Sequence, residues 1–389
     1  MRSLFFIFAV VLTWGLTMIN TSGLGLVHDT PGKTNMLIGI WCVCFVLTKR
    51  CFLKTITSNS ILAFFTILSF VIFPLLTTGS KDGLSYLMMV PLVYCFSELK
   101  VTEKVMLLSG YIIAGLGIFV LFVYTKTEIL SGWNDNHISM IGLFSYIYYS
   151  VSLYGKMTGR KATIGLAISL LYVVLLFSTN SRSGIIFIVL SVILSYRSGW
   201  FKVLLTNRNF LFYALNVPLI VSLIFIYFPD FFVFQYFEEW SIENFGKSAF
   251  NGRDILWRLA YERLFETYLI GKGEIFMNHH NSAVAVLSVF GVIGYVCWYK
   301  MFAKPLLFIR EYLNDDLTLG FLSSFFLIFW QQSFELGFVH SSPNMLPYVI
   351  LGLGIARARR EQLQQLLQYK SCRRVNKQPP FFGPIYFFR

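Results

Sequence analysis

The stretch VMLLSGYIIAGLGIFVLFVY, residues 105–124, contains twenty residues without a charge. A helix of that length rises about 30 Å, which matches the thickness of a bilayer's hydrocarbon core. Backbone groups in hydrocarbon must pair within their own segment, so the run predicts a membrane-spanning helix. The alternating ten-residue patterns that are typical of membrane β-strands do not occur in the sequence.

Similar apolar runs recur along the whole 389-residue chain, which is 56% hydrophobic and only 13% charged. Soluble domains carry about 25% charged residues. We therefore predict an all-α fold, a polytopic membrane bundle with about 12 transmembrane helices. The predicted spans are residues 4–19, 35–48, 60–77, 83–96, 105–124, 137–154, 162–177, 183–196, 209–229, 282–302, 317–334 and 344–357.

The net charge of +13 is distributed unevenly over the connectors between these runs. Every second connector is rich in Lys and Arg, whereas the others carry about one basic residue each. This alternation follows the positive-inside rule and places both termini in the cytoplasm. It also explains the charge without a nucleic-acid partner. The rich connectors hold Lys49, Arg50, Lys54, Lys100, Lys104, Lys156, Arg160, Lys161, Arg197, Lys202, Arg208, Lys300, Lys304 and Arg310.

We expect the chain to divide into four parts: spans one to nine (1–229), a loop on the outward side (230–281), spans ten to twelve (282–357) and a basic cytoplasmic tail (358–389). Within the loop, Trp257, Tyr261, Leu264 and Tyr268 form one stripe of an amphipathic helix. We expect this helix to begin at an Asn251 cap, to end near Gly271 and to lie in the outer interface.

The tail opens with three arginines, Arg357, Arg359 and Arg360. We interpret this start as a cytoplasmic flank that touches anionic headgroups.

Two arginines on the outward side are candidates for binding phosphate. Arg253 lies in the first turn of the predicted loop helix, where free backbone N–H groups and the helix dipole favour an anion. The alternative is an ordinary surface arginine that pairs with Asp254 or a lipid headgroup. Arg182 lies between two apolar runs that are separated by almost no loop, so it is expected at or just within the outer interface of the membrane. An ionisable group there is costly unless it is paired.

His279, His280 and Asn281 precede the tenth predicted span. An imidazole is suited to taking a proton from a hydroxyl near neutral pH. The alternative is a polar helix start that is capped by Asn281. Glu335 and His340 lie in the last outward connector and are candidates for lining an acceptor site. The histidine spacing is unlike a usual ligand set, so we predict no metal and no cofactor.

An ordered set of motifs over about residues 175–300 resembles the O-antigen ligase/polymerase superfamily of bacterial envelope glycan enzymes. The first half of the chain resembles that family only as a run of spans. The motifs are Ser181-Arg182-Ser183-Gly184, Gly252-Arg253-x-x-x-Trp257, Gly271-x-Gly273, His280-Asn281 and Gly291-x-x-Gly294.

The resemblance implies a metal-independent, inverting glycosyl transfer from an undecaprenyl-diphosphate donor in the bacterial inner membrane, with the active site facing the periplasm. It implies that Arg182 and Arg253 hold the diphosphate and that His280 activates the acceptor hydroxyl, with His279 as the alternative. Its expected partners are a lipid-linked glycan donor and acceptor, membrane lipids and a chain-length regulator. The expected substrate-binding residues are Arg258, His279, Asn281, Glu335 and His340.

Three functions are compatible with these observations. A polymerase would transfer the growing glycan to the terminal sugar of a lipid-linked repeat unit, and this is the function we favour. A ligase would transfer it to the lipid A core. A lipid-linked oligosaccharide flippase, or another transporter, would need charges or broken helices near the middle of the membrane. The sequence instead gathers its unusual polar residues at one face.

Overall fold

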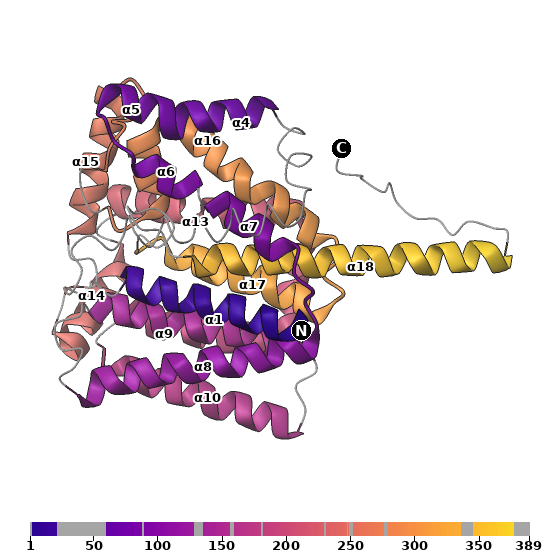
Figure 1. The fold of residues 1–389 in the computed structure, drawn as a ribbon. Coiled ribbons are helices and arrows are strands. Elements are labelled where there is room, and N and C mark those ends of the chain that lie inside the picture. The colour runs from indigo at the N-terminus through magenta and orange to yellow at the C-terminus, as the bar shows by residue number, and fades with distance from the viewer. Residues whose placement is uncertain are drawn as a thin grey trace.

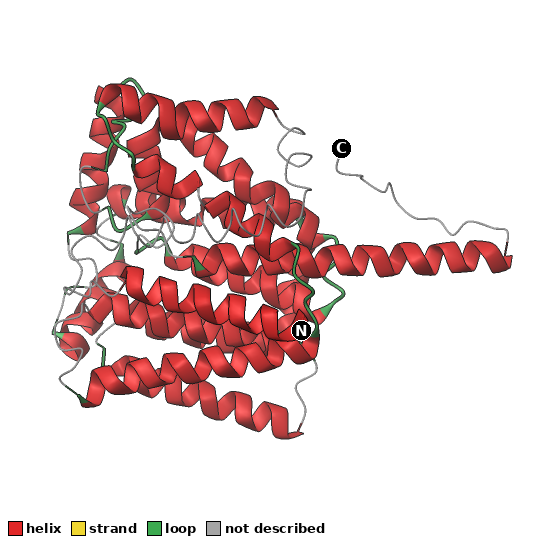
Figure 2. Cartoon of the chain, viewed as in Figure 1, coloured by secondary structure: helices red, strands yellow, loops and turns green. Residues whose placement is uncertain are grey.

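The computed structural model describes residues 2–21, 60–87, 89–127, 135–155, 159–179, 182–228, 231–246, 248, 252–275, 279–335 and 345–376. All regular structure in these ranges is helical, which confirms the all-α prediction (Figure 2). The elements are α1 (Arg2–Thr21), α4 (Ser60–Ile67), η2 (Leu68–Ile72), α5 (Phe73–Thr77), α6 (Asp82–Leu87), α7 (Met89–Ser97), α8 (Glu103–Lys126), α9 (Asp135–Ser150), η4 (Val151–Leu153), α10 (Gly159–Phe177), α11 (Arg182–Tyr196), α12 (Ser198–Thr206), α13 (Arg208–Tyr227), α14 (Phe232–Phe245), α15 (Arg253–Glu266), α16 (Ser282–Arg310), α17 (Asp316–Gln331) and α18 (Leu346–Asn376).

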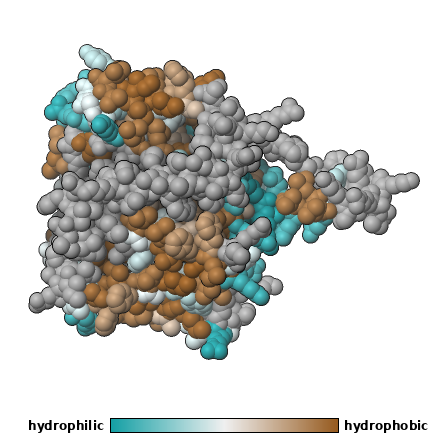
Figure 3. All heavy atoms as spheres, viewed as in Figure 1, coloured by the Kyte–Doolittle hydropathy of each residue, from teal (hydrophilic) through white to brown (hydrophobic). Residues whose placement is uncertain are grey.

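The bundle has a membrane-like character. Three described helices, α8, α13 and α16, are long and apolar enough to cross a bilayer, and α11 with α12 would make a fourth span despite a 91° bend. Large apolar side chains on α8 and α10 remain exposed, such as Phe119 and Val174 at 63% each, as lipid contact would require. Figure 3 shows apolar side chains over much of the described face and hydrophilic ones where α18 leaves the body. The number twelve stays a prediction, and the predicted span 35–48 lies outside the described residues.

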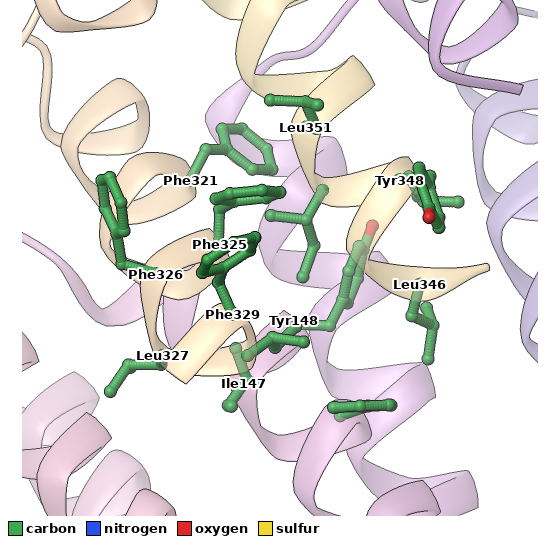
Figure 4. Packing of buried hydrophobic residues seen from close by; sticks show 14 of the residues in the cluster. Ile147, Tyr148, Phe321, Phe325, Phe326, Leu327, Phe329, Leu346, Tyr348 and Leu351 are labelled. Carbon is green, nitrogen blue, oxygen red and sulfur yellow. The ribbon is translucent and has the colours of Figure 1, made fainter. Parts of the chain in front are cut away.

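The centre of the bundle is α9, which packs against α8, α10, α11 and α17. Its side chains from Ile138 onward are buried. Two buried tyrosine hydroxyls there are paired: the Tyr146 hydroxyl lies 2.7 Å from Ser169 Oγ, and the Tyr148 hydroxyl lies 3.0 Å from Ser109 Oγ. Aromatic and branched side chains of α9, α17 and α18 fill the space between these helices (Figure 4).

Helix α16 is broken at Gly291, whose φ of 70° is not helical. The connector after α15 supplies the missing backbone partners. The Lys272 and Gly273 N–H groups donate to the carbonyls of Ser288 and Val289, at 2.9 and 2.8 Å, and Val292 N–H donates to the carbonyl of residue 269 at 3.0 Å. A Cβ atom on Gly291 would lie 2.1 Å from the carbonyl oxygen of residue 270. The glycine motifs at 271–273 and 291 thus let two backbones meet.

The described residues of the predicted last span and of the tail form one helix, α18, which projects from the body (Figure 1). The arginines that we assigned to lipid headgroups instead bond within the protein, which corrects that interpretation. Arg357 is buried and pairs with Asp315 and Glu361, and Arg359 lies 2.9 Å from Glu98. Figure 1 places the N-terminus and the projecting α18 at one end of the bundle, and α14 and α15 at the other.

Candidate functional site

The predicted loop helix is present as α15, but its bounds differ from the prediction. Its N-cap is Gly252, with a left-handed φ of 70°, and not Asn251, which lies outside the described residues. The helix ends at Glu266 and does not reach Gly271, and Tyr268 is 88% exposed. A second helix in the same region, α14, was not predicted. The loop is therefore more structured than the sequence indicates.

Helix α15 is held by its buried face, which packs on α13 and α16. Trp257 is wholly buried, and its indole N–H donates to the carbonyl of His279 at 2.6 Å. The Trp257 ring lies 5.5 Å from that of Phe225 on α13, in an edge-to-face arrangement. Trp257 therefore fixes α15 against the segment that precedes α16, and Arg253 starts this helix one turn earlier.

The residues before α16 divide into two structural anchors and one partly exposed side chain. Asn281 caps α16 by accepting from the N–H groups of residues 283 and 284, and its amide donates to the carbonyls of Pro218 and Ser333 at 2.7 and 3.2 Å. His279 is buried, with Nε2 2.9 Å from Ser288 Oγ. His280 keeps 28% of its side chain exposed and has a φ of 47°.

A left-handed backbone at a residue with a side chain costs about 1–3 kcal/mol and is common at functional sites. Of the two histidines, this geometry favours His280 as the residue that meets a ligand, because His279 and Asn281 are occupied inside the protein.

Glu335, after the end of α17, lies between the two candidate groups. Its Oε1 is 3.6 Å from Arg253 Nη2, and its Oε2 is 3.8 Å from His280 Nδ1. The carboxylate is 10% exposed, so both contacts are shielded from bulk water. One acidic side chain therefore connects the candidate phosphate-binding arginine to the candidate base.

Arg182, the first residue of α11, reaches the same place from another direction. Its guanidinium donates to Ser241 Oγ on α14 and, at 2.6 Å, to the carbonyl of Ser248. It lies close enough to Arg253 for the two positive charges to repel each other, and Glu238 attracts it. Arg182, Arg253, His280 and Glu335 therefore converge at the end of the bundle that holds α14 and α15.

The charge of Arg253 is buried, and its one described carboxylate partner, Glu335, is 3.6 Å away. Arg253 is only 9% exposed, and this burial lowers the pKa of its guanidinium, against the opposing effect of Glu335. Arg253 Nε is buried without a hydrogen-bond partner among the described residues. An unmade hydrogen bond at a buried donor costs about 1–3 kcal/mol. Two adjacent guanidinium groups and the start of α15 are well suited to an anion with several oxygens.

The other predicted site residues are placed differently. Arg258 is exposed on α15 and is five residues from Arg253, about 140° around the helix. It contributes nothing to the cluster in this conformation. His340 lies outside the described residues. In the part of the chain that the structure describes, no three His, Cys, Asp or Glu side chains are grouped as metal ligands would be.

Sequence reasoning missed the contribution of α14. Ser241 is wholly buried against Arg182, and Glu238 is three residues earlier. The one available signal is this i, i+3 spacing, which puts a hydroxyl and a carboxylate on one face of a helix.

In comparisons with known proteins, the chain matches no family model and no curated protein sequence. The resemblance to the O-antigen ligase/polymerase superfamily therefore depends on the ordered motifs alone.

Proposed function

We propose that this protein is a membrane glycosyltransferase that polymerises O-antigen or a related surface polysaccharide. The observation that carries the proposal is that Arg253 and His280 both contact Glu335 and that Arg182 is close enough to Arg253 for their charges to repel, since these residues come from four separate parts of the chain. A partly buried cationic cluster beside an imidazole is suited to a reaction in which a diphosphate leaves and a hydroxyl attacks.

The two guanidinium groups would bind the diphosphate of an undecaprenyl-linked donor. Negative charge on that diphosphate grows as the bond to the sugar breaks, so fixed cations stabilise the transition state more than the ground state. Burial strengthens the interaction, because little water is present to screen it. Ser241 and the Ser248 carbonyl hold Arg182 in position for this role.

His280 would act as the general base. Its ring nitrogen takes the proton of an acceptor sugar hydroxyl, and the oxygen attacks the anomeric carbon from the side opposite the diphosphate. The bond from that carbon to the diphosphate oxygen breaks, and the electron pair leaves with undecaprenyl diphosphate. The anomeric configuration inverts, and the growing glycan passes to the terminal sugar of another lipid-linked repeat unit.

The proposed topology has about 12 spans in a bacterial inner membrane, both termini in the cytoplasm and the site facing the periplasm. The helices that carry the cationic cluster, α14 and α15, lie at one end of the bundle, and the N-terminus and the projecting α18 lie at the other (Figure 1). This separation supports the proposed topology. Cysteine labelling of Ser248 from outside intact spheroplasts tests the orientation. The proposal expects labelling there and none at Gln364 on α18.

Incubation of the purified protein with a lipid-linked repeat unit and a metal chelator tests the reaction, with products separated on a gel. A ladder of longer lipid-linked glycans is expected, and absence of the ladder contradicts a polymerase. A strain without the gene separates the ligase alternative. It would make single-repeat lipopolysaccharide if the protein is a polymerase, and lipopolysaccharide without attached O-antigen if it is a ligase.

A lipid-linked oligosaccharide flippase is the second candidate, because the break of α16 at Gly291 is the type of discontinuous helix that transporters use. The two functions differ in chemistry. A flippase moves a fluorescent lipid-linked glycan across a vesicle membrane and leaves its length unchanged, whereas a polymerase lengthens it.

A further inference from the structure

We propose that Glu335 is an internal competitor of the donor: it neutralises Arg253 in the empty site and is displaced towards His280 when a diphosphate binds. This inference rests on the proposed function and assigns Glu335 a role other than binding the acceptor sugar. It links arrival of the donor to positioning of the base through one carboxylate.

The distances describe a carboxylate that is shared and not committed. Charge-assisted N–H···O bonds have lengths of about 2.7–2.9 Å. The Glu335 oxygens lie 3.6 Å from Arg253 and 3.8 Å from His280, so neither contact is a full hydrogen bond. The backbone of Glu335 is held separately, since its carbonyl accepts from Ser282 Oγ at 3.4 Å. The side chain can therefore move between its two neighbours while the backbone stays in place.

The cationic side of the site favours exchange of the carboxylate for a diphosphate. Arg253 is repelled by Arg182 and, among the described residues, forms an ion pair with Glu335 only. Its buried Nε has no hydrogen-bond partner in that same set. A diphosphate has more charge and more oxygens than one carboxylate, and it can contact both guanidinium groups at once.

Displacement would have a consequence at the base. A carboxylate that accepts from Nδ1–H of His280 fixes the tautomer that leaves Nε2 free to take a proton. In the empty site the Glu335 contact, at 3.8 Å, is longer than such a bond. Once diphosphate occupies Arg253, Glu335 is free to complete its contact with His280. Binding of the donor would then add a carboxylate contact to the base.

The experiment separates binding from transfer in full-length protein in nanodiscs. Binding of inorganic pyrophosphate and of undecaprenyl diphosphate is measured by calorimetry, and glycan transfer is measured on the same samples. In Glu335→Gln, we expect pyrophosphate to bind at least about fivefold more tightly, the low end of ordinary coupling between sites, because the competing charge is gone. Transfer should nevertheless fall about tenfold or more, because the base loses its carboxylate.

Matched variants make the result interpretable. Glu262→Gln removes an equal charge from the exposed face of α15 and should leave both quantities unchanged. Glu335→Ala should likewise bind pyrophosphate more tightly and transfer glycan more slowly. It replaces Glu335→Gln if that variant does not purify as a folded protein.

Weaker or unchanged pyrophosphate binding in the Glu335 variants overturns the inference, because a purely structural glutamate would weaken binding. Failure of the proposed function looks different. Wild-type protein would then form no polymer, although the pyrophosphate measurement would still show whether Glu335 competes.

Discussion

Both ends of the bundle contain a buried arginine, but the two arginines are satisfied in different ways. Arg357 on α18 donates from Nε to Asp315 at 2.9 Å, and it contacts Glu361 at 3.1 Å. Arg253 on α15 has one carboxylate at 3.6 Å and an Nε without a partner among the described residues. A closed ion network holds helices together, whereas an open one leaves binding capacity for a ligand.

The largest expected effect is on activity at the open end. Arg253→Ala should lower the rate of glycan transfer about 100- to 1,000-fold, the usual cost of removing one donor that stabilises developing negative charge. Membrane insertion and thermal stability should change less than transfer, because the ion pair of Arg253 with Glu335 is long, at 3.6 Å. The measurements are a product gel and a thermal unfolding curve. Transfer at the wild-type rate would remove the proposed mechanism, and the same holds for Arg182→Ala and His280→Ala.

The opposite pattern is expected at the closed end. Arg357→Met leaves Asp315 and Glu361 without their buried partner and should lower the free energy of unfolding by about 4 kcal/mol. Transfer per folded molecule should be unchanged, since Arg357 pairs with Asp315 at the start of α17, whereas Glu335 follows the end of that helix. Arg359→Met is the control, because the Arg359 side chain is 43% exposed and such pairs contribute about 1 kcal/mol or less. Equal losses in the two variants would show that burial does not distinguish these ion pairs.

The sequence predicts the helices and the residues of the cluster better than the contacts between those residues. The run 105–124 predicts α8, and the run 209–229 predicts α13, each within a few residues, because apolar length alone defines such helices. Motif order placed Arg182, Arg253 and His280 together. Glu335 could not be predicted as their link, because its position depends on how the segment after α17 approaches the start of α15.

The tail arginines and the break in α16 were missed for a related reason. A run of arginines after an apolar segment has the same sequence pattern whether lipid or a carboxylate is its partner. A glycine within an apolar run is equally compatible with an unbroken helix. Only the approach of residues 269–273 shows why Gly291 leaves the helical conformation.

Gly291→Ala tests whether the break supports the open end. The added Cβ would lie 2.1 Å from a carbonyl oxygen and would force a left-handed φ on a residue with a side chain. We expect a loss of about 3 kcal/mol in unfolding free energy, from backbone strain alone at the upper end of its usual range, and reduced transfer. Gly115→Ala on α8 is the control, since its Cβ would meet no atom within 4 Å. An unchanged Gly291→Ala protein would mean that the break is not required.

The closed end should also respond to pH. Burial raises the pKa of Asp315, but hydrogen bonds and the charge of Arg357 outweigh it, so the net pKa is lowered from 3.8. A lowered pKa in the folded state means that the ionised carboxylate stabilises the fold above pH 3.8 and that this contribution is lost as the pH falls below it. Asp315→Asn should therefore cost about 2 kcal/mol at neutral pH, the loss of a charged hydrogen bond. Denaturation curves of both proteins should converge in acid, and a constant difference would contradict this origin.

The smallest effect concerns Trp257, which connects α15 to the His279 carbonyl through one hydrogen bond of 2.6 Å. Trp257→Phe keeps an aromatic ring beside Phe225 but removes the N–H donor, so the cost in stability should be about 1 kcal/mol. If that bond positions His280 relative to Arg253, transfer should fall more than stability implies, while pyrophosphate binding stays at the wild-type level. Parallel losses of binding and transfer would instead mean that Trp257 holds the whole open end. The contrast between the two ends would then be one of stability as well as of chemistry.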